Sequence, residues 1–248
     1  MKLGIFDSGV GGLTVARSLQ RSGCFSELLY YGDTARVPYG SKDANTVTRY
    51  ALEAVEFFNG ANVDALVVAC NTVSVVALEQ MQRFSNKPVY GVLEPGVMVL
   101  EQLPEIDKSA RVLVIATRST IGSGEYQRRI QQLGYNNVDA LPTPLFVPIV
   151  EEELYEGAIL QETFKHYFKA LPKPDVVLLG CTHFPLIAEP ISTYFDGAQT
   201  IHSGEAMLQW LKQHLDLPEQ YAQTPITILA SENVEAVKRV ATRWQLNL

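Results

Sequence analysis

The feature that most constrains the fold is a segment that occurs twice. Residues 63–72 read VDALVVACNT and residues 174–183 read PDVVLLGCTH. Their aspartates and their cysteines correspond at one spacing of 111 residues (175 − 64 and 181 − 70). KLGIFDS, from Lys2, resembles RVLVIATR, from Arg111, at a similar spacing of 109 (111 − 2). An internal repeat of this kind predicts two similar α/β domains related by a pseudo-twofold axis.

Short β-branched and apolar runs alternate with stretches of helical spacing, such as Val47, Ala51, Ala54, Val55 and Phe58. This alternation predicts an α/β protein with mostly parallel sheets. We expect a first domain of residues 1–94 plus about 205–248, and a second of residues 95–204, with the crossing at Glu94–Pro95. The predicted strands are residues 2–6, 28–31, 65–69, 89–92, 111–116, 138–141, 176–180, 200–201 and 226–230.

Composition excludes several classes of function. The net charge of −7, without a Lys/Arg cluster, argues against nucleic acid and anionic membranes as partners. The N-terminal MKLGIFDSG does not resemble a signal peptide, and no apolar run is long enough to span a bilayer. Three scattered cysteines suit neither a disulfide framework nor a metal site. We therefore expect a cytoplasmic protein with free thiols and no bound metal.

Polar residues follow four of the predicted strands. In parallel α/β sheets, ligands bind outside the carboxyl ends of the strands, where helix N-termini favour a carboxylate. The glycine-rich segment matches neither GxGxxG nor GxxxxGK[ST], so it indicates either a tight turn or a close approach of backbone to a small anion. The four segments are Asp7-Ser8-Gly9-Val10-Gly11-Gly12, Cys70-Asn71-Thr72, Thr117-Arg118-Ser119-Thr120 and Cys181-Thr182-His183.

The matched cysteines indicate a specific chemistry. A lone buried cysteine is usually a small hydrophobic residue, and we assign Cys24 that role. If the two domains face each other, Cys70 and Cys181 flank one cleft. One thiolate would then remove an α-hydrogen, and the opposite thiol would protonate the other face of the carbanion. A helix N-terminus after each cysteine is expected to favour the thiolate.

Further residues are candidates for supporting this chemistry. Asp7 is a candidate helper for Cys70, and His183 for Cys181, although a helix cap or a hydrogen-bonded loop would explain either residue. Asp33–Gly40 is either a surface loop or a flap over the substrate. Glu151 follows a proline-framed run and is either a solvated helix start or part of the site. Backbone N–H groups and the hydroxyls of Ser8, Thr72, Thr117, Thr120 and Thr182 would stabilise an enediolate.

Five motifs, FDSGVGGLTV, GDTARVPYG, ACNTVS, PLFVPIVE and GCTHFP, together resemble the glutamate racemases of the aspartate/glutamate racemase superfamily. The matches run in order from Lys2 to about Gly204. The resemblance implies catalysis by Cys70 and Cys181 without pyridoxal phosphate or metal, and a homodimer that supplies D-glutamate for peptidoglycan. It assigns assisting roles to Asp7, His183 and Glu151, and substrate contacts to Asp7, Ser8, Tyr39, Gly40, Asn71, Thr72, Thr117, Thr120, Thr182 and His183.

The sequence departs from the family pattern at Val73, Ser119 and Thr143, where alanine, glycine and cysteine are respectively common. None of the three is a predicted catalytic position. The region after Gly204 matches only loosely.

Three alternatives remain at this point. A thiol hydrolase with Cys181 as nucleophile and His183 as base would leave Cys70 without a role. A two-lobed amino-acid-binding protein would need neither thiol. Within the racemases, aspartate differs from glutamate by one methylene, which is worth only about 1–3 kcal/mol of discrimination.

Overall fold

The computed structural model describes residues 1–103, 106–217 and 224–248. Within these ranges the strands form two sheets, and every recorded strand pairing is parallel. The first sheet has the order β4-β3-β1-β2-β9, from β1 (Lys2–Asp7), β2 (Glu27–Gly32), β3 (Ala65–Val68), β4 (Val89–Gly91) and β9 (Ile226–Ala230). The second has the order β6-β5-β7-β8, from β5 (Arg111–Ala116), β6 (Asn137–Pro142), β7 (Val176–Gly180) and β8 (Gln199–His202).

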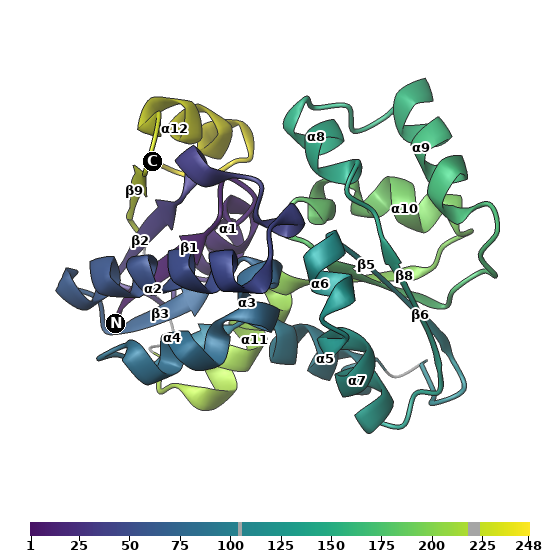
Figure 1. Cartoon of the computed structure of the whole chain (residues 1–248), viewed down its shortest axis with the longest axis horizontal. Coiled ribbons are helices and arrows are strands. Elements are labelled where there is room, and N and C mark those ends of the chain that lie inside the picture. Colours follow the sequence, from purple (N-terminus) through teal and green to yellow (C-terminus); the bar gives the residue numbers. More distant parts are fainter. Residues whose placement is uncertain (104–105, 218–223) are drawn as a thin grey trace.

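The two sheets repeat one arrangement, as the doubled segment predicts. The order β4-β3-β1-β2 in the first sheet corresponds to β8-β7-β5-β6 in the second. Cys70 follows β3 and Cys181 follows β7, so the two cysteines occupy equivalent positions. The predicted α/β fold with two similar parallel sheets is confirmed. The sheets lie in separate lobes, side by side in Figure 1.

The aspartates of the repeat have a structural role at the start of the strands. Asp64 Oδ2 accepts from the backbone N–H of Lys2 at 2.7 Å, and Asp175 Oδ2 accepts from that of Arg111 at 2.8 Å. In both lobes the backbone N–H of the aspartate also donates to the carbonyl of the same strand residue. Each aspartate therefore fixes the register of the strand that ends in a cysteine against its neighbour.

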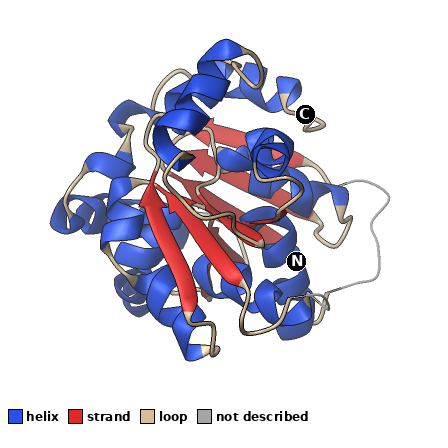
Figure 2. Ribbon diagram, turned by 90° about the vertical axis from the view of Figure 1, so that its right-hand side faces the viewer, coloured by secondary structure: helices blue, strands red, loops and turns tan. Residues whose placement is uncertain are grey.

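Helices cover both sheets, and Figure 2 shows them flanking the strands. The predicted helical pattern from Val47 to Phe58 is the buried face of α2. The helices are α1 (Leu13–Arg21), α2 (Ala44–Gly60), α3 (Asn71–Val76), α4 (Leu78–Phe84), α5 (Leu93–Gln102), α6 (Arg118–Gly122), α7 (Glu125–Gln132), α8 (Phe146–Glu151), α9 (Ala158–Phe168), α10 (Ala188–Tyr194), α11 (Ser203–His214) and α12 (Val234–Arg243). Three short 3-10 segments are η1 (Thr34–Arg36), η2 (Tyr39–Ser41) and η3 (Phe184–Ile187).

The chain passes between the lobes through helices. Glu94–Pro95, the predicted crossing, lies in the first turn of α5, which packs against both α7 and α11. The last strand, β9, pairs with β2 in the first sheet. The domain boundaries at about residues 94 and 205 stay predictions, because the connecting helices pack on both sides of them. Within the described ranges, no helix combines the length and the apolar character that a membrane crossing requires.

Candidate active site

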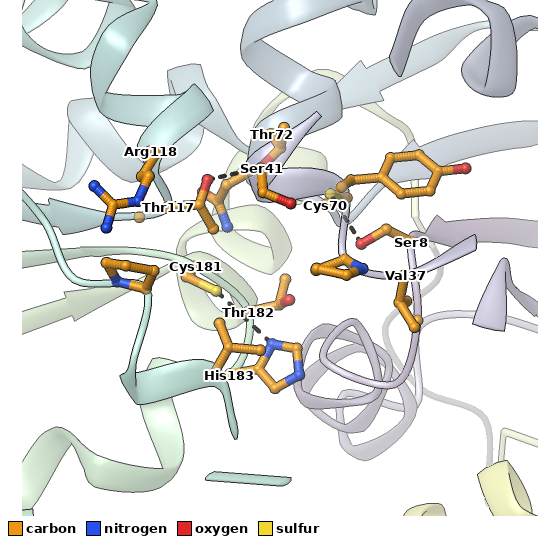
Figure 3. Close-up of a pocket in the computed structure, with 18 of the residues that line it drawn as sticks. Ser8, Val37, Ser41, Cys70, Thr72, Thr117, Arg118, Cys181, Thr182 and His183 are labelled. Carbon is orange, nitrogen blue, oxygen red and sulfur yellow. Dashed lines mark hydrogen bonds between the residues drawn. The ribbon is translucent and has the colours of Figure 1, made fainter. Parts of the chain in front are cut away.

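A cavity of about 310 Å³ lies where the strand ends of both sheets meet. Figure 3 shows Cys70 and Cys181 on different sides of it, together with residues from both lobes. Most of the predicted site residues line this cavity: Ser8, Tyr39, Gly40, Cys70, Asn71, Thr72, Thr117, Glu151, Cys181, Thr182 and His183. Asp7 and Thr120 are absent from the lining, and both are fully buried behind the wall.

The Cys70 thiol sits in a buried environment that favours its neutral form. Its Sγ lies 3.4 Å from Ser8 Oγ, to which it donates. Burial, and then the negative charge of Asp7, raise the pKa of Cys70 to about 12, although hydrogen bonds with Ser8 and with the N–H of Val73 lower it. The expected preference of Cys70 for the thiolate at this helix N-terminus is therefore wrong. The burial of the thiol raises its pKa by more than the N–H groups in the first turn of α3 lower it.

The Cys181 thiol has a cationic neighbour. His183 Nδ1 lies 3.7 Å from Cys181 Sγ, and His183 Nε2 lies 2.9 Å from Glu151 Oε1. Burial alone would lower the pKa of His183, but the hydrogen bonds and charges of Cys181 and Glu151 outweigh it and raise the pKa to about 10. His183 is therefore an imidazolium at neutral pH, with both ring nitrogens donating. This arrangement places a positive charge beside the Cys181 thiol.

Glu151 reaches His183 from the end of a helix. The alternative interpretation of Glu151 as a solvated helix start is wrong, because it is the last residue of α8. Phe146, at the start of α8, packs edge-on against Phe184 with ring centroids 5.5 Å apart. This aromatic contact holds α8 against the segment that follows His183. The packing thus fixes the distance between the carboxylate and the imidazole.

Asp7 is buried without a direct bond to either thiol. Its Oδ2 accepts from the Gly9 N–H at 2.9 Å, and among the described residues its Oδ1 has no hydrogen-bond partner. Burial raises the pKa of Asp7, against the positive charge of His183 and the N–H groups of the turn that follows. Asp7 therefore acts on Cys70 through its charge, and it shapes the glycine turn through its oxygen.

Glycine is needed in the turn after β1 because the turn lies close to the segment that follows Cys181 in the second lobe. A methyl group on Gly11 would lie 2.3 Å from Thr182 Oγ1 and 2.5 Å from His183 Nδ1. A methyl group on Gly12 would lie 2.5 Å from Asp7 Cβ. At both positions a larger residue would force neighbouring atoms to shift. The turn is a close-packed joint between the lobes, as the interpretation of a tight turn predicts, whereas the approach of its backbone to a small anion stays a prediction.

The segment Asp33–Gly40 forms one wall of the cavity. Asp33 is fully buried, and its Oδ2 accepts from the hydroxyl of Tyr39 and from Arg36 Nε, the latter at 2.7 Å. Ser119 of the second lobe places its Oγ 3.0 Å from the carbonyl oxygen of Gly40. The segment is therefore anchored in the first lobe and tied to the second.

Three threonine hydroxyls from both lobes form a cluster. Thr72 Oγ1 lies 3.0 Å from Thr117 Oγ1 and 3.1 Å from Thr120 Oγ1, and the last two lie 3.0 Å apart. Because Thr120 is buried behind the others, it orients them rather than facing the cavity. The cluster therefore places Thr72 and Thr117 on the cavity wall in a fixed orientation.

Sequence reasoning missed several residues of the wall. Some lie inside segments that the sequence singled out, so their position next to predicted residues was the available signal. These residues are Gly9, Val37, Pro38, Ser41, Arg118, Pro144, Val147, Pro148 and Gly180. Within residues 1–103, 106–217 and 224–248, no three His, Cys, Asp or Glu side chains are grouped as the ligands of a metal ion would be.

Comparison with known proteins places this site in a family. The model of the family described as Asp/Glu/Hydantoin racemase matches residues 14–211. A glutamate racemase from a Nitratiruptor species is 51% identical over 245 residues, which cover 98% of this chain and 96% of that protein. The chain belongs to the Asp/Glu/hydantoin racemase family. It is therefore an isomerase, and the resemblance carried by the five motifs is confirmed.

Solved structures agree with this membership. The crystal structure of glutamate racemase from Campylobacter jejuni subsp. jejuni has a TM-score of 0.96 to this racemase at 45% identity, over 100% of both chains. Glutamate racemase from Francisella tularensis subsp. tularensis, in complex with D-glutamate, has a TM-score of 0.83 at 28% identity. That match covers 98% of this racemase and 93% of the other chain.

Proposed function

We propose that this racemase interconverts L-glutamate and D-glutamate by a two-base mechanism, with Cys70 and Cys181 as the bases and without a cofactor. One observation carries the mechanism: equivalent strands of the two sheets bring one thiol each to the same cavity. Relatives named as glutamate racemases support the substrate, as does the related structure in complex with D-glutamate.

The two thiols have different neighbours, and we assign them different roles at the start of one direction. Cys181, beside the His183 imidazolium, acts as the base, and Cys70, whose pKa is raised by burial, acts as the proton donor. The Cys181 thiolate removes the α-hydrogen of one enantiomer, and the electron pair stays on the substrate as a carbanion. The Cys70 thiol then donates its proton to the opposite face of the α-carbon. The product leaves a thiol at Cys181 and a thiolate at Cys70, which is the starting state for the reverse direction.

The carbanion requires stabilisation as an enediolate. Asn71 and the hydroxyls of Thr72 and Thr117 line the cavity and provide donors to a carboxylate, as do Ser8 and Thr182. Asp7 and Thr120, both behind the wall, hold the glycine turn and the hydroxyl cluster in place.

The test is circular dichroism of L-glutamate with purified protein and no added cofactor. The wild-type signal should decay to zero, and Cys70→Ala and Cys181→Ala should each abolish the decay while remaining folded. Cys24→Ala is the matched control, because Cys24 is 2% exposed and does not line the cavity. Full activity in either variant of the paired cysteines would disprove the two-base mechanism.

The thiol hydrolase is the second candidate, because Cys181, His183 and Glu151 form a connected thiol–imidazole–carboxylate row. It predicts that Cys70→Ala keeps its activity and that glutamate is not racemised. Aspartate in the same assay tests the substrate. We expect glutamate to be preferred by about 10- to 200-fold, the range that one methylene provides.

The wider role is proposed from the family resemblance that the five motifs carry. We infer a cytoplasmic homodimer that supplies D-glutamate for peptidoglycan synthesis. Rescue of a D-glutamate-requiring bacterial strain tests the supply of D-glutamate, and failure of the active enzyme to rescue growth would contradict it. Sedimentation tests the dimer, which a fully active monomer at all concentrations would disprove.

A further inference from the structure

A tyrosine outside the predicted site connects the two halves of the cavity. Tyr126 lies in the first turn of α7, in the second lobe, and is 1% exposed. A methyl group on Gly180, the residue before Cys181, would lie 3.4 Å from Tyr126 Cε2. The Tyr126 hydroxyl donates to Oδ1 of Asn71, the residue after Cys70. Tyr126 therefore bonds to the residue after one thiol and lies near the residue before the other.

In the Asn71 amide the oxygen has hydrogen-bond partners, and among the described residues the nitrogen has none. Its Oδ1 accepts from the Tyr126 hydroxyl and lies 3.4 Å from Ser203 Oγ. Asn71 is 3% exposed and lines the cavity, yet among the described residues its Nδ2 has no hydrogen-bond partner. A buried N–H without a partner costs free energy. A ligand that accepts from Nδ2 removes that cost, and a carboxylate is the best acceptor available in an amino acid.

The orientation of this amide depends on Tyr126. An asparagine amide has nearly the same shape when its oxygen and nitrogen exchange places, so its partners decide which one faces the cavity. Burial, and then the charges of Cys181 and Cys70, raise the pKa of Tyr126, so its hydroxyl stays protonated and needs an acceptor. In a flipped amide the NH₂ group would donate to the Tyr126 oxygen, and the hydroxyl hydrogen would lose the acceptor that it has in Asn71 Oδ1. The flipped amide would also present an oxygen to the substrate carboxylate.

We propose that Tyr126 is a positioning residue, which holds the Asn71 amide so that Nδ2 presents its N–H groups to a carboxylate of the substrate. The inference rests on the proposed glutamate racemisation and adds a residue that does not line the cavity. Tyr126 acts through Asn71 and does not touch the substrate itself.

The first test is Tyr126→Phe, which removes one hydroxyl and keeps the ring. We expect KM for glutamate to rise about three- to tenfold, the effect of one hydrogen bond, with kcat changed less than about twofold. The alkaline limb of the pH profile should stay in place, because the contacts of Cys181 with His183 are untouched. A shifted limb with an unchanged KM would overturn the proposal and indicate general disturbance around β7.

The matched control is Tyr135→Phe. Tyr135 is also 1% exposed, belongs to the same lobe, and donates its hydroxyl to the carbonyl of Leu100 at 2.9 Å. It does not line the cavity. Its loss should lower the melting temperature as much as Tyr126→Phe does, and leave KM and kcat unchanged. If KM rises equally in Tyr135→Phe, the loss of any buried hydrogen bond in this lobe has the same effect. That result would overturn the proposal.

A double-mutant cycle tests whether Tyr126 acts through Asn71. In the Asn71→Ala background, Tyr126→Phe should have no further effect on kcat/KM. Independent effects that multiply would overturn the proposal. If Tyr126→Phe does not fold, Asn71→Asp replaces it, because this variant keeps the acceptor for Tyr126 and removes the donor to the substrate. An unchanged KM in Asn71→Asp would equally overturn the proposal.

The same assays separate this inference from the proposed function. If the wild-type enzyme does not racemise glutamate, the proposed function fails. If the wild type racemises glutamate and Tyr126→Phe matches it in KM, only the role of Tyr126 fails.

Discussion

His183 contacts a thiol on one side and a carboxylate on the other. The carboxylate of Glu151 is partly accessible, with 45% of its side chain exposed, whereas His183 and Cys181 are buried. Glu151 can therefore be replaced without leaving a hole in the core. It is the residue through which the charge of His183 can be tested with the least structural damage.

Glu151→Gln should lower the pH at which the enzyme loses its activity on the alkaline side. In the wild type, kcat/KM should fall as the pH rises through the His183 pKa of about 10, because the imidazolium that stabilises the Cys181 thiolate is lost. The Glu151 carboxylate raises that pKa, so its removal lowers it, and the alkaline limb should move down by about one pH unit. Glu152→Gln, an exposed neighbour, is the control. An unmoved limb in Glu151→Gln would contradict this assignment.

At the residue scale, the sequence predicts which side chains belong to the site better than it predicts the burial and charge around them. The repeat and the motifs predict that Cys70, Cys181 and His183 belong to one site, and all three line the cavity. The neutral state of the Cys70 thiol was not predicted, since it depends on burial beside Asp7. Tyr126 was missed because no sequence pattern connects it with Asn71, which is 55 positions away.

Among the elements, the turn between β1 and α1 has the tightest fit. Gly11 faces Thr182 and His183 across the junction of the lobes, and Thr14 Oγ1 lies 2.8 Å from the Thr182 carbonyl oxygen. A side chain at Gly11 must displace the segment that follows Cys181, because the turn is held by α1 on its other side.

Gly11→Ala should reduce kcat by more than about 100-fold and destabilise the fold by about 1–3 kcal/mol, the usual result of overpacking. Assays of racemisation and denaturant unfolding measure both effects. Gly60→Ala is the control, because a methyl group there meets no atom within 4 Å among the described residues, and activity should be unchanged. A fully active Gly11→Ala variant would show that the joint is looser than its distances indicate.

The hydrogen bonds that Asp64 and Asp175 accept at the strand starts stabilise the fold and have no part in catalysis. Asp64→Ala and Asp175→Ala should each lower the free energy of unfolding by about 0.5–1.5 kcal/mol, because each removes an acceptor from a strand N–H. Neither should change kcat or KM. Glu56→Ala, an exposed change on α2, serves as the control for urea unfolding. A loss of activity without a loss of stability would contradict this structural role of the two aspartates.

Strands were easier to predict than their connections. Arg111–Ala116, Val176–Gly180 and Ile226–Ala230 are found with the predicted bounds, because buried parallel strands are continuous apolar runs. The predicted crossing at Glu94–Pro95 lies in the first turn of α5, and the domain boundary there stays a prediction. A proline in the first turn of a helix is compatible with helical structure, so this pattern does not distinguish a linker from a helix start.

For the whole molecule, a net charge of −7 repels an anionic substrate at long range. Arg118 is an exposed cation on the cavity wall, and no ion pair is recorded for it among the described residues. The other cation of the cavity, His183, is already paired with Glu151. Arg118 therefore provides local attraction that the overall charge opposes.

Arg118→Gln should raise KM for glutamate about two- to fivefold at low salt and leave kcat unchanged, the size expected for one solvent-exposed charge. Increasing salt should reduce the difference between variant and wild type, because exposed charges are screened. Steady-state kinetics at two ionic strengths test this, with Arg83→Gln on the exposed surface of α4 as the control. Equal KM values at low salt would refute a role in substrate attraction.

The two thiols have unequal surroundings: an imidazolium with its carboxylate beside Cys181, and a serine with a buried aspartate behind Cys70. L-glutamate and D-glutamate are mirror images and have the same free energy in water. Whatever bias the unequal lobes introduce, equilibrium must hold both enantiomers in equal amounts. The asymmetry of the protein can therefore make kcat differ between the two directions only if KM differs by the same factor. The ratio kcat/KM must be the same for L-glutamate and D-glutamate.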